Sequence, residues 1–208
     1  MDPSQPTAAK TAVRDRLETS RNRRSLAEVA RCAAQIADHL LAQPEVRRAA
    51  SVAAYVSVGH EPGTGILLER LLAAGKRVLL PLTVGSLARG GLDLDWAPYQ
   101  GPGSLAAARF GLLEPVTEPL GRDAIGTPDA LLVPGLAVSP AGVRLGKGGG
   151  CYDKALARVP VGTFTCVLLY ADEVGLEVPV EPHDRAVTHA ATPDGVIRLP
   201  LGRPVAAG

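Results

Sequence analysis

The sequence predicts an α/β protein whose mainly parallel sheet is covered by helices. Apolar runs of strand length, rich in Val, Leu and Ala, alternate along the chain with segments whose apolar residues repeat at helical spacing. Residues 51–82 are typical of a strand, a loop, a helix and a second strand, which form a βαβ unit with a parallel pair and a right-handed crossover. A third apolar run, at 129–133, enters a glycine-rich loop and then a further helix. This order of elements is typical of α/β folds.

The bulk properties indicate one cytoplasmic domain. A chain of 208 residues can bury roughly 70% of the surface of its unfolded form, so we expect a single domain over 1–208, with disordered tails at 1–6 and 203–208. The net charge of +1 gives no reason to expect nucleic acid or an anionic membrane as a partner. The N-terminus lacks a signal-peptide pattern, and no apolar run approaches the length of a membrane span.

Cysteines and aromatic residues narrow the chemistry. Cys32, Cys151 and Cys166 show neither a CxxC pair nor zinc-ligand spacing, so we expect free thiols in a reducing cytosol. Aromatic residues make up only 3% of the chain. The core must therefore be aliphatic, and the few aromatic side chains in loops are candidates for ligand contacts.

Two helices are expected first. From Thr7 onward, Lys10 and Arg14 fall one turn apart on one helical face, where the alternative is that both are solvated surface charges. Ser25 should cap the second helix, with Glu28 as its capping-box partner. The apolar stripe of that helix ends before Pro44 and consists of Leu26, Val29, Ala33, Ile36, Ala37, Leu40 and Leu41.

The βαβ unit follows. Its strand at Ser51–Val58 leads through a loop at Gly59–Gly63 into a helix at Thr64–Ala74, where Gly75 is the stop signal, and the second strand is Arg77–Leu82. Ligands of open α/β sheets bind outside the carboxyl ends of the strands, so the 59–63 loop should lie near a site.

The second half continues the alternation. A strand with one exposed face is expected at Leu92–Ala97, followed by a loop at 101–115. Further strands are expected at Asp129–Val133, Thr165–Tyr170 and Gly195–Leu199, with a helix at Tyr152–Val159 and a proline-interrupted segment at 178–189.

The stretch from Val133 to Asp153 is the strongest candidate for a binding loop. Five glycines between Gly142 and Gly150 let backbone N–H groups approach a ligand closely, and Arg144 and Lys147 lie among them. Such a loop, leading into a helix, suits a polyphosphate. It matches neither the P-loop nor the dinucleotide fingerprint, and the alternative is a flexible surface turn.

Residues 129–156, DALLVPGLAVSPAGVRLGKGGGCYDKAL, resemble the signature of the 5-formyltetrahydrofolate cyclo-ligases, also called methenyltetrahydrofolate synthetases. The resemblance extends in order along the whole chain. Further matches are Lys10 and Arg14 to K-x-x-x-R, Tyr55 to Thr64 to Y-x-x-x-x-x-E-x-[DE]-T, Gly75 to Pro81 to G-K-x-x-x-x-P, then Phe110-Gly111, Glu114-Pro115, Pro179, Glu181, His183, Asp184 and Thr192.

The resemblance implies an ATP-dependent, C–N ring-closing ligase of NagB/RpiA/CoA-transferase-like fold. The family closes 5-formyltetrahydrofolate to 5,10-methenyltetrahydrofolate with ATP and Mg²⁺ and releases ADP and phosphate. The formyl oxygen would be phosphorylated, the folate N10 would attack the activated carbon, and phosphate would leave. Such chemistry needs positioning and charge neutralisation more than a protein nucleophile. ATP and a reduced folate are then the small-molecule partners of a monomer or homodimer.

The resemblance also implies residue roles. Arg144 and Lys147 would be catalytic, and Asp153 and Asp184 would bind Mg²⁺. ATP would contact Lys10, Arg14, Arg144, Leu145, Gly146, Lys147, Gly148, Gly149, Gly150 and Tyr152. The folate would contact Val58, Glu61, Phe110, Lys147 and Tyr152.

Plainer interpretations stay open beside these roles. Asp153 is also an ordinary acid of a first helical turn, Asp184 a turn cap, Glu61 a solvated loop charge and Phe110 a core residue. His183 is expected to orient other groups or to be structural, and His39 and His60 receive no role.

Three positions depart from the family pattern. Gly63 occupies its second acidic position, Cys151 replaces its first tyrosine, and Val138 stands where phenylalanine is common, which indicates a packing change. The first two favour a rival, a divergent paralogue that uses ATP to activate another formamide or carboxylate. A second rival is a nucleotide-binding module without turnover, against which Arg144, Lys147 and Asp153 argue.

Overall fold

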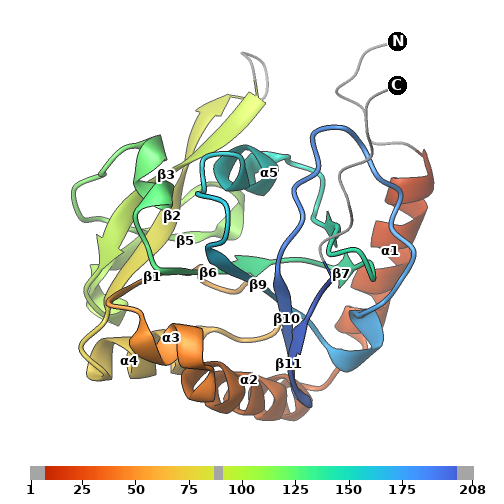
Figure 1. Ribbon diagram of the computed structural model, residues 1–208, viewed down its shortest axis with the longest axis horizontal. Coiled ribbons are helices and arrows are strands. Elements are labelled where there is room, and N and C mark those ends of the chain that lie inside the picture. The colour runs from red at the N-terminus through yellow and green to blue at the C-terminus, as the bar shows by residue number, and fades with distance from the viewer. Residues whose placement is uncertain (1–7, 87–90, 201–208) are drawn as a thin grey trace.

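The computed structural model describes residues 8–86 and 91–200, and the expected tails at 1–6 and 203–208 lie outside that part. A seven-stranded sheet forms its centre, in the order β11-β10-β9-β6-β1-β2-β3 (Figure 1). The five strands from β10 to β2 are parallel, and each edge strand is antiparallel to its neighbour. The predicted α/β class is confirmed. The strands are β1 Ser51–Ala53, β2 Arg77–Ser86, β3 Gly91–Tyr99, β6 Ala130–Pro134, β9 Phe164–Leu168, β10 His189–Thr192 and β11 Gly195–Arg198.

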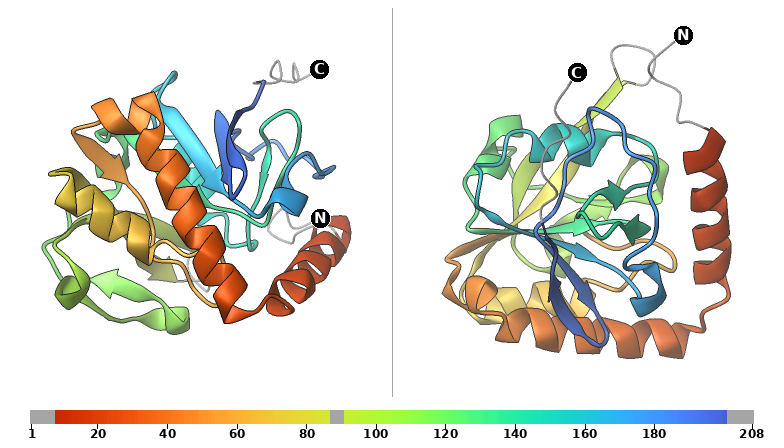
Figure 2. Two further views of the ribbon diagram at one scale, coloured as in Figure 1. Left: turned by 90° about the horizontal axis from the view of Figure 1, so that it is seen from below. Right: turned by 45° about the vertical axis from the view of Figure 1, so that its right-hand side comes forward.

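Helices cover both faces of the sheet (Figure 2). Val52, Val78 and Leu80 point to the face where α2 and α4 pack, whereas Ala53 and Leu79 point to the opposite face, beneath α5. This alternation follows from the two-residue period of a strand. Helix α1 lies beyond one end of the sheet and contributes Leu17 to a third, smaller cluster. The helices are α1 Ala8–Asn22, α2 Leu26–Ala42, α3 Pro44–Arg48, α4 Gly65–Ala73 and α5 Cys151–Leu156.

Local signals in the sequence set the helix ends. The Ser25 hydroxyl accepts the Glu28 N–H at 3.2 Å, so the predicted cap is confirmed. Pro44 sits in the first turn of α3, a short helix that the sequence reading missed, where its missing N–H costs nothing. Leu26 is 79% exposed, so its place in the predicted stripe is wrong, because the first turn of α2 is left uncovered.

Two strand predictions need correction. The expected strand at Ser51–Val58 ends at Ala53, because the chain leaves the sheet after the Ala54 N–H bonds to Leu79. The apolar run correctly indicated burial, since Tyr55 is 3% exposed, but burial alone does not mark where pairing stops. The prediction that the strand at Leu92–Ala97, now β3, has one exposed face is wrong. Asp93 on that strand is buried in ion pairs with arginines.

Several short elements escaped the sequence reading. The expected loop at 101–115 contains an antiparallel hairpin of β4, Leu105–Ala107, and β5, Leu113–Pro115. Two-residue strands, β7 at Ala137–Val138 and β8 at Arg144–Leu145, pair within the glycine-rich stretch. The strand β10 was also missed. Such short pairings carry too few residues for a clear periodic signal.

Other expectations hold. All three cysteines are free. Val138 is fully buried in the core beside α5, as expected for a packing change. Among the described residues, no helix combines the length and the apolar character needed to cross a membrane.

Candidate active site

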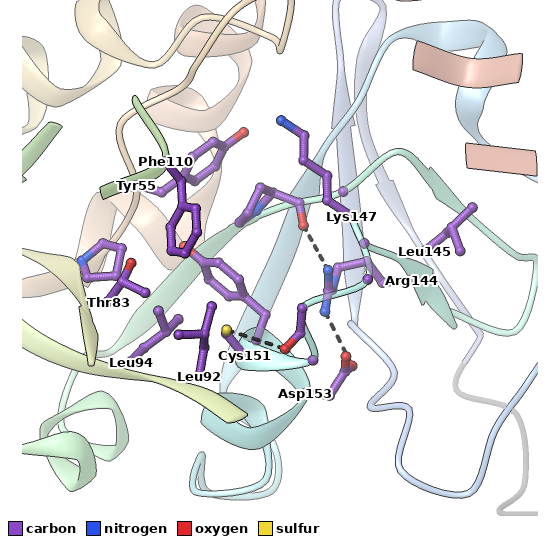
Figure 3. Close-up of a pocket in the computed structure, with 18 of the residues that line it drawn as sticks. Tyr55, Thr83, Leu92, Leu94, Phe110, Arg144, Leu145, Lys147, Cys151 and Asp153 are labelled. Atoms are coloured by element: carbon purple, nitrogen blue, oxygen red, sulfur yellow. Dashed lines mark hydrogen bonds and ion pairs between the residues drawn. The ribbon is translucent and has the colours of Figure 1, made fainter. Parts of the chain in front are cut away.

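A cavity of about 540 Å³ opens where the parallel strands end. Its walls come from the segment after β1, the ends of β2 and β6, the β4–β5 hairpin, the loop between β8 and α5, and one face of α1 (Figure 3). This is the end of an α/β sheet at which ligands bind. Every residue to which the resemblance assigns a role lines this cavity, including Val58 and Leu145. Their individual roles stay predictions.

The glycine-rich loop forms one wall. It leaves β8 at Leu145 and enters α5 through Gly150, which has a left-handed conformation with φ of 65°. Gly148 also has a positive φ of 95°, and a Cβ there would meet the Arg14 guanidinium at 3.4 Å. Within the described part of the chain, the backbone N–H groups of residues 147–150 make no hydrogen bond with protein. They are therefore available as donors to a ligand.

Helix α1 brings two cations to the same wall. Lys10 is 3% exposed and contacts Glu181 at 2.6 Å and Asp184 at 2.8 Å, so its interpretation as a solvated surface charge is wrong. The Arg14 Nε donates to the Gly146 carbonyl at 2.8 Å. The predicted face with two cations one turn apart thus lies on the cavity and not in bulk solvent.

Arg144 lies beneath the glycine-rich loop and is 5% exposed. Its guanidinium contacts Asp153 at 3.3 Å and donates to the Pro134 carbonyl at 3.2 Å. The guanidinium carbon also lies 5.6 Å from the centre of the Tyr152 ring. The buried Nε has no hydrogen-bond partner in the described part of the chain.

Carboxylates gather on the side of the cavity facing α1. Glu181, His183 and Asp184 each offer a ligand atom within 4.8 Å of the others. Asp184 also accepts the Glu181 N–H at 2.7 Å, so its carboxylate caps the turn before it and not, as the alternative had it, the next one. Asp153 does not belong to this group of three, and it accepts the Arg185 N–H at 3.3 Å. Carboxylate oxygens from separate segments suit Mg²⁺, which usually keeps several waters.

Glu61 lines the cavity from the segment between β1 and α4. It is 7% exposed, so its interpretation as a solvated loop charge is wrong. One carboxylate oxygen contacts Lys147 Nζ at 2.7 Å, and the other accepts the Val58 N–H at 2.9 Å. The loop carrying Glu61 is closed by reciprocal bonds between Ser57 and Thr64, at 2.9 and 3.0 Å. Glu61 is therefore held in place before any ligand arrives.

Phe110 projects from the β4–β5 hairpin and is 62% exposed, which excludes the interpretation as a core residue. Its φ of 61° is a left-handed conformation that a side chain adopts at a cost of roughly 1–2 kcal/mol. The neighbouring Arg109 secures this turn by donating to the Thr83 and Gly85 carbonyls, at 2.7 and 3.2 Å. The hairpin thus presents an exposed aromatic ring to the cavity from a turn that Arg109 holds in place.

Two tyrosine hydroxyls in the cavity are unsatisfied. Tyr55 and Tyr152 each bury the hydroxyl oxygen without a hydrogen-bond partner in residues 8–86 and 91–200. Burial, and after it the negative charge of Glu61, raises the pKa of both phenols, so both stay protonated. The sequence reading missed Tyr55 as a site residue, although an aromatic at a strand end in so aromatic-poor a chain was a usable signal.

The remaining positions divide between site and scaffold. His183 and Cys151 line the cavity. Gly63 is not among the described residues that line it. His39 lies on α2, and its ring forms a hydrogen bond with the Pro193 carbonyl at 3.0 Å. The His60 carbonyl accepts a hydrogen bond from the Tyr170 hydroxyl at 3.1 Å. These two histidines thus have structural contacts.

Comparisons with known proteins point in one direction. A model of the 5-formyltetrahydrofolate cyclo-ligase family matches residues 6–193. The 5-formyltetrahydrofolate cyclo-ligase of Mycolicibacterium smegmatis is 45% identical over 150 residues, covering 72% of this chain and 77% of that relative. The Escherichia coli K12 protein of that name is 32% identical over 170 residues, 78% of this chain and 88% of its own. The NMR structure of Aquifex aeolicus 5,10-methenyltetrahydrofolate synthetase superposes with a TM-score of 0.77 at 27% identity, over 95% of this chain and 96% of that one.

Proposed function

Because this chain belongs to the 5-formyltetrahydrofolate cyclo-ligase family, we propose that it closes 5-formyltetrahydrofolate to 5,10-methenyltetrahydrofolate at the expense of ATP. The observation that carries this assignment to the cavity is the 2.7 Å ion pair between Lys147 and Glu61. It joins the wall suited to a polyphosphate to the wall suited to a pterin. Atoms of two substrates can therefore meet within reach of one lysine.

We propose that the phosphates of ATP lie along the glycine-rich loop. The N–H groups of residues 147–150, which have no partner in the described part of the chain, and the cations Arg14 and Arg144 would supply the donors. Lys10 adds its charge beside Asp184. ATP would transfer its terminal phosphoryl group to the formyl oxygen, and Lys147 would stabilise the charge that develops during transfer. The folate N10 then attacks the activated carbon and gives up its proton to solvent, and the C–O bond breaks as phosphate departs with the oxygen.

We propose Asp153 and Asp184 as the residues that would hold Mg²⁺. Their carboxylates line the same cavity as the phosphate-binding loop, and both come from segments beside it. When bound there, the ion would neutralise phosphate charge. Lys10 and Arg144 now neutralise these two carboxylates, so they also set how much negative charge the ion would meet.

The pterin is proposed to bind between Glu61 and Phe110. A carboxylate held by the Val58 N–H and Lys147 can accept both donors of the pterin edge, N3–H and the 2-amino group. Phe110 can stack on the ring from the mouth of the cavity, and Tyr152 can line its inner side. We further propose a cytoplasmic enzyme, monomeric or homodimeric, that acts without nucleic acid or membrane.

Purified protein with ATP, Mg²⁺ and 5-formyltetrahydrofolate tests this function. We expect the near-ultraviolet absorbance of the methenyl product to develop, with one ADP released per ring closed. ATP binding without that product would refute the assignment. ATP hydrolysis driven instead by another formamide or carboxylate would identify the divergent paralogue, for which the Cys151 substitution in the cavity wall is the specific argument.

A further inference from the structure

The Tyr55 hydroxyl has no role in the function proposed above. Tyr55 lies on the connection from β1 to α4, where it is 3% exposed and lines the cavity. Its hydroxyl is buried and has no hydrogen-bond partner in the described residues. Buried polar groups in native proteins are nearly always paired, and an unpaired one costs free energy. A hydroxyl left unpaired in a cavity wall is therefore a candidate contact for the ligand.

The position of Tyr55 relative to Glu61 is fixed. Both residues belong to the segment between β1 and α4, which the reciprocal Ser57–Thr64 bonds close into a rigid loop. Both line the same cavity. The charge of Glu61 adds to burial in raising the pKa of the Tyr55 phenol, as a nearby carboxylate must. Both groups therefore line one cavity from one closed loop, and the phenol stays protonated as an O–H donor.

Glu61 does not satisfy that donor. Its carboxylate oxygens accept from Lys147 and the Val58 N–H, and no hydrogen bond joins them to the Tyr55 hydroxyl among the described residues. Each oxygen keeps a further lone pair for donors of a ligand. The hydroxyl and the carboxylate therefore present two different functions side by side: an acceptor at Glu61 and a donor at Tyr55. A ligand that fits both must carry donors on one part of an edge and an acceptor next to them.

We propose that Tyr55 donates to the 4-oxo group of the pterin ring and so selects 4-oxo over 4-amino pteridines. This inference rests on the proposed folate site. When N3–H and the 2-amino group face Glu61, the next atom along that edge is the 4-oxo oxygen, an acceptor. A 4-amino pteridine presents a donor at this place and lacks the N3 hydrogen, so it offers the Tyr55 hydroxyl no matching acceptor.

Tyr152 is the less suitable donor for this contact, although its hydroxyl is also unpaired. It sits in the first turn of α5, directly after the phosphate-binding loop, and its ring faces the Arg144 guanidinium at 5.6 Å. Tyr55 and Tyr152 line the cavity from different elements, and Figure 3 shows Tyr55 beside Phe110. Tyr152 thus comes from α5, whereas Tyr55 shares with Glu61 the segment between β1 and α4, which sets the position of its hydroxyl relative to that carboxylate.

Tyr55→Phe tests the proposal, because it removes one oxygen and keeps the ring. Calorimetry should show that the substitution changes the affinity for folic acid but not the affinity for 4-amino-4-deoxyfolate. We expect Tyr55→Phe to weaken folic acid about tenfold, which corresponds to ~1.4 kcal/mol, and to change 4-amino-4-deoxyfolate by less than about twofold. The ATP dissociation constant should not move. The melting temperature should be unchanged or higher, since the hydroxyl has no partner to lose.

Tyr99→Phe is the matched control. Tyr99 is a 5% exposed tyrosine of β3 that lies outside the cavity lining among the described residues, so both pterin affinities should stay as in the original protein. Equal folic acid affinities of Tyr55→Phe and the original protein would overturn the inference. So would equal weakening of both pterins, or a fall in melting temperature that matches the loss of binding.

The outcome separates this inference from the proposed function. A protein that binds folic acid in a Tyr55-dependent way but does not close 5-formyltetrahydrofolate would refute the proposed reaction and keep the contact. A protein that closes the ring with unchanged kcat/KM in Tyr55→Phe, and unchanged folic acid affinity, would keep the reaction and refute the contact. Failure of the original protein to bind either pterin would overturn both.

Discussion

Gly63 stands where the family pattern has a second acidic residue, and its surroundings explain what that departure means. A Cβ built at Gly63 would lie 3.0 Å from the Ala33 Cβ on α2, closer than most real contacts. The position thus faces the helix that covers the sheet and not the cavity. A side chain at this place would require Ala33 of α2 to give way by a few tenths of an ångström. The loss of this acid therefore gives no support to a changed substrate, and Glu61 is left as the proposed pterin anchor.

Gly63→Asp should consequently lower stability without improving folate binding. Pressing a side chain against Ala33 should cost about 1–3 kcal/mol in the free energy of unfolding, measured by urea denaturation. The KM for 5-formyltetrahydrofolate should not fall. Gly65→Asp serves as the control, because a Cβ there meets nothing within 4 Å and an acid suits the first turn of α4. A lower KM in Gly63→Asp would show that the pattern's second acid acts in binding.

Lys147 is the residue that connects the two proposed substrate sites. Its side chain keeps 49% exposure while its Nζ contacts the buried Glu61 carboxylate. This combination suits a group that reorients toward a developing charge, because the lysine is not enclosed by protein on all sides. The Glu61 pair keeps the ammonium inside the cavity until substrates bind.

Lys147→Ala should lower kcat about 100-fold and change the ATP dissociation constant by less than about fivefold. The reason is that charge stabilisation in the transition state acts on the rate more than on ground-state binding. Lys76→Ala is the matched control, since Lys76 lies outside the cavity and bonds to the Arg47 and Ala49 carbonyls. An unchanged kcat in Lys147→Ala would remove the catalytic role.

At the level of elements, helix α1 is attached to the site by its charges. The Lys10 contacts to Glu181 and Asp184 span 171 and 174 residues of sequence, and Arg14 bonds to Gly146 across 132. Leu17, Leu136 and Leu145 pack below these polar contacts. Farther along α1, the Arg21 guanidinium makes a buried pair with Glu173 at 2.7 Å. The helix is therefore a wall of the cavity, held by polar contacts above and apolar contacts below.

Arg14→Ala should raise the KM for ATP by about tenfold or more. It removes a cation from the phosphate-binding wall together with the charge-assisted bond that positions the Gly146 carbonyl. Arg16→Ala, an exposed position of the same helix, should leave both kinetic constants unchanged. Steady-state kinetics at varied ATP measure the difference. Equal behaviour of the two variants would exclude α1 from ATP binding.

At the scale of the whole molecule, the edge of the sheet depends on a buried acid. Asp93 in β3 contacts Arg158 at 2.7 Å and Arg122 at 3.3 Å, and these arginines lie beyond α5 and in the connection before β6. The hydrogen bonds from Arg158 lower the pKa of Asp93 below its usual value. The carboxylate therefore favours the folded state above the unfolded pKa of about 3.9, and this contribution is lost as the pH falls through the lower, folded pKa.

Asp93→Asn should lower the free energy of unfolding by about 1–3 kcal/mol at pH 7. The difference from the original protein should shrink as the pH falls below about 4, because the original Asp93 then becomes neutral as well. Urea denaturation at a series of pH values measures it. Asp123→Asn is the control, since its side chain is 96% exposed and 3.6 Å from Arg158. A difference that stays constant with pH would contradict the role of the ion pair.

The sequence by itself determined what depends on near neighbours in the chain. The parallel βαβ unit, the Ser25 cap and the glycine-rich entry to α5 all follow from periodicity and turn chemistry within a few residues. Where the pattern was short, as at β7, β8 and the β4–β5 hairpin, local signals were too weak. The residues of the candidate site were found through the ordered motif, which the spacing of glycines alone did not specify.

Only the tertiary structure decided which side chains lose their water and which groups they meet. From the sequence, Lys10 could be a surface charge, but in the structure Glu181 and Asp184 pair with it. From the sequence, Gly63 could be a lost ligand-binding acid, but in the structure it lies against Ala33. Tyr55 was predicted to belong to a strand, but the chain leaves the sheet before it, and Tyr55 lines the cavity with a buried hydroxyl that has no partner in the described residues. Burial and pairing of this kind arise between residues far apart in sequence, so no local pattern encodes them.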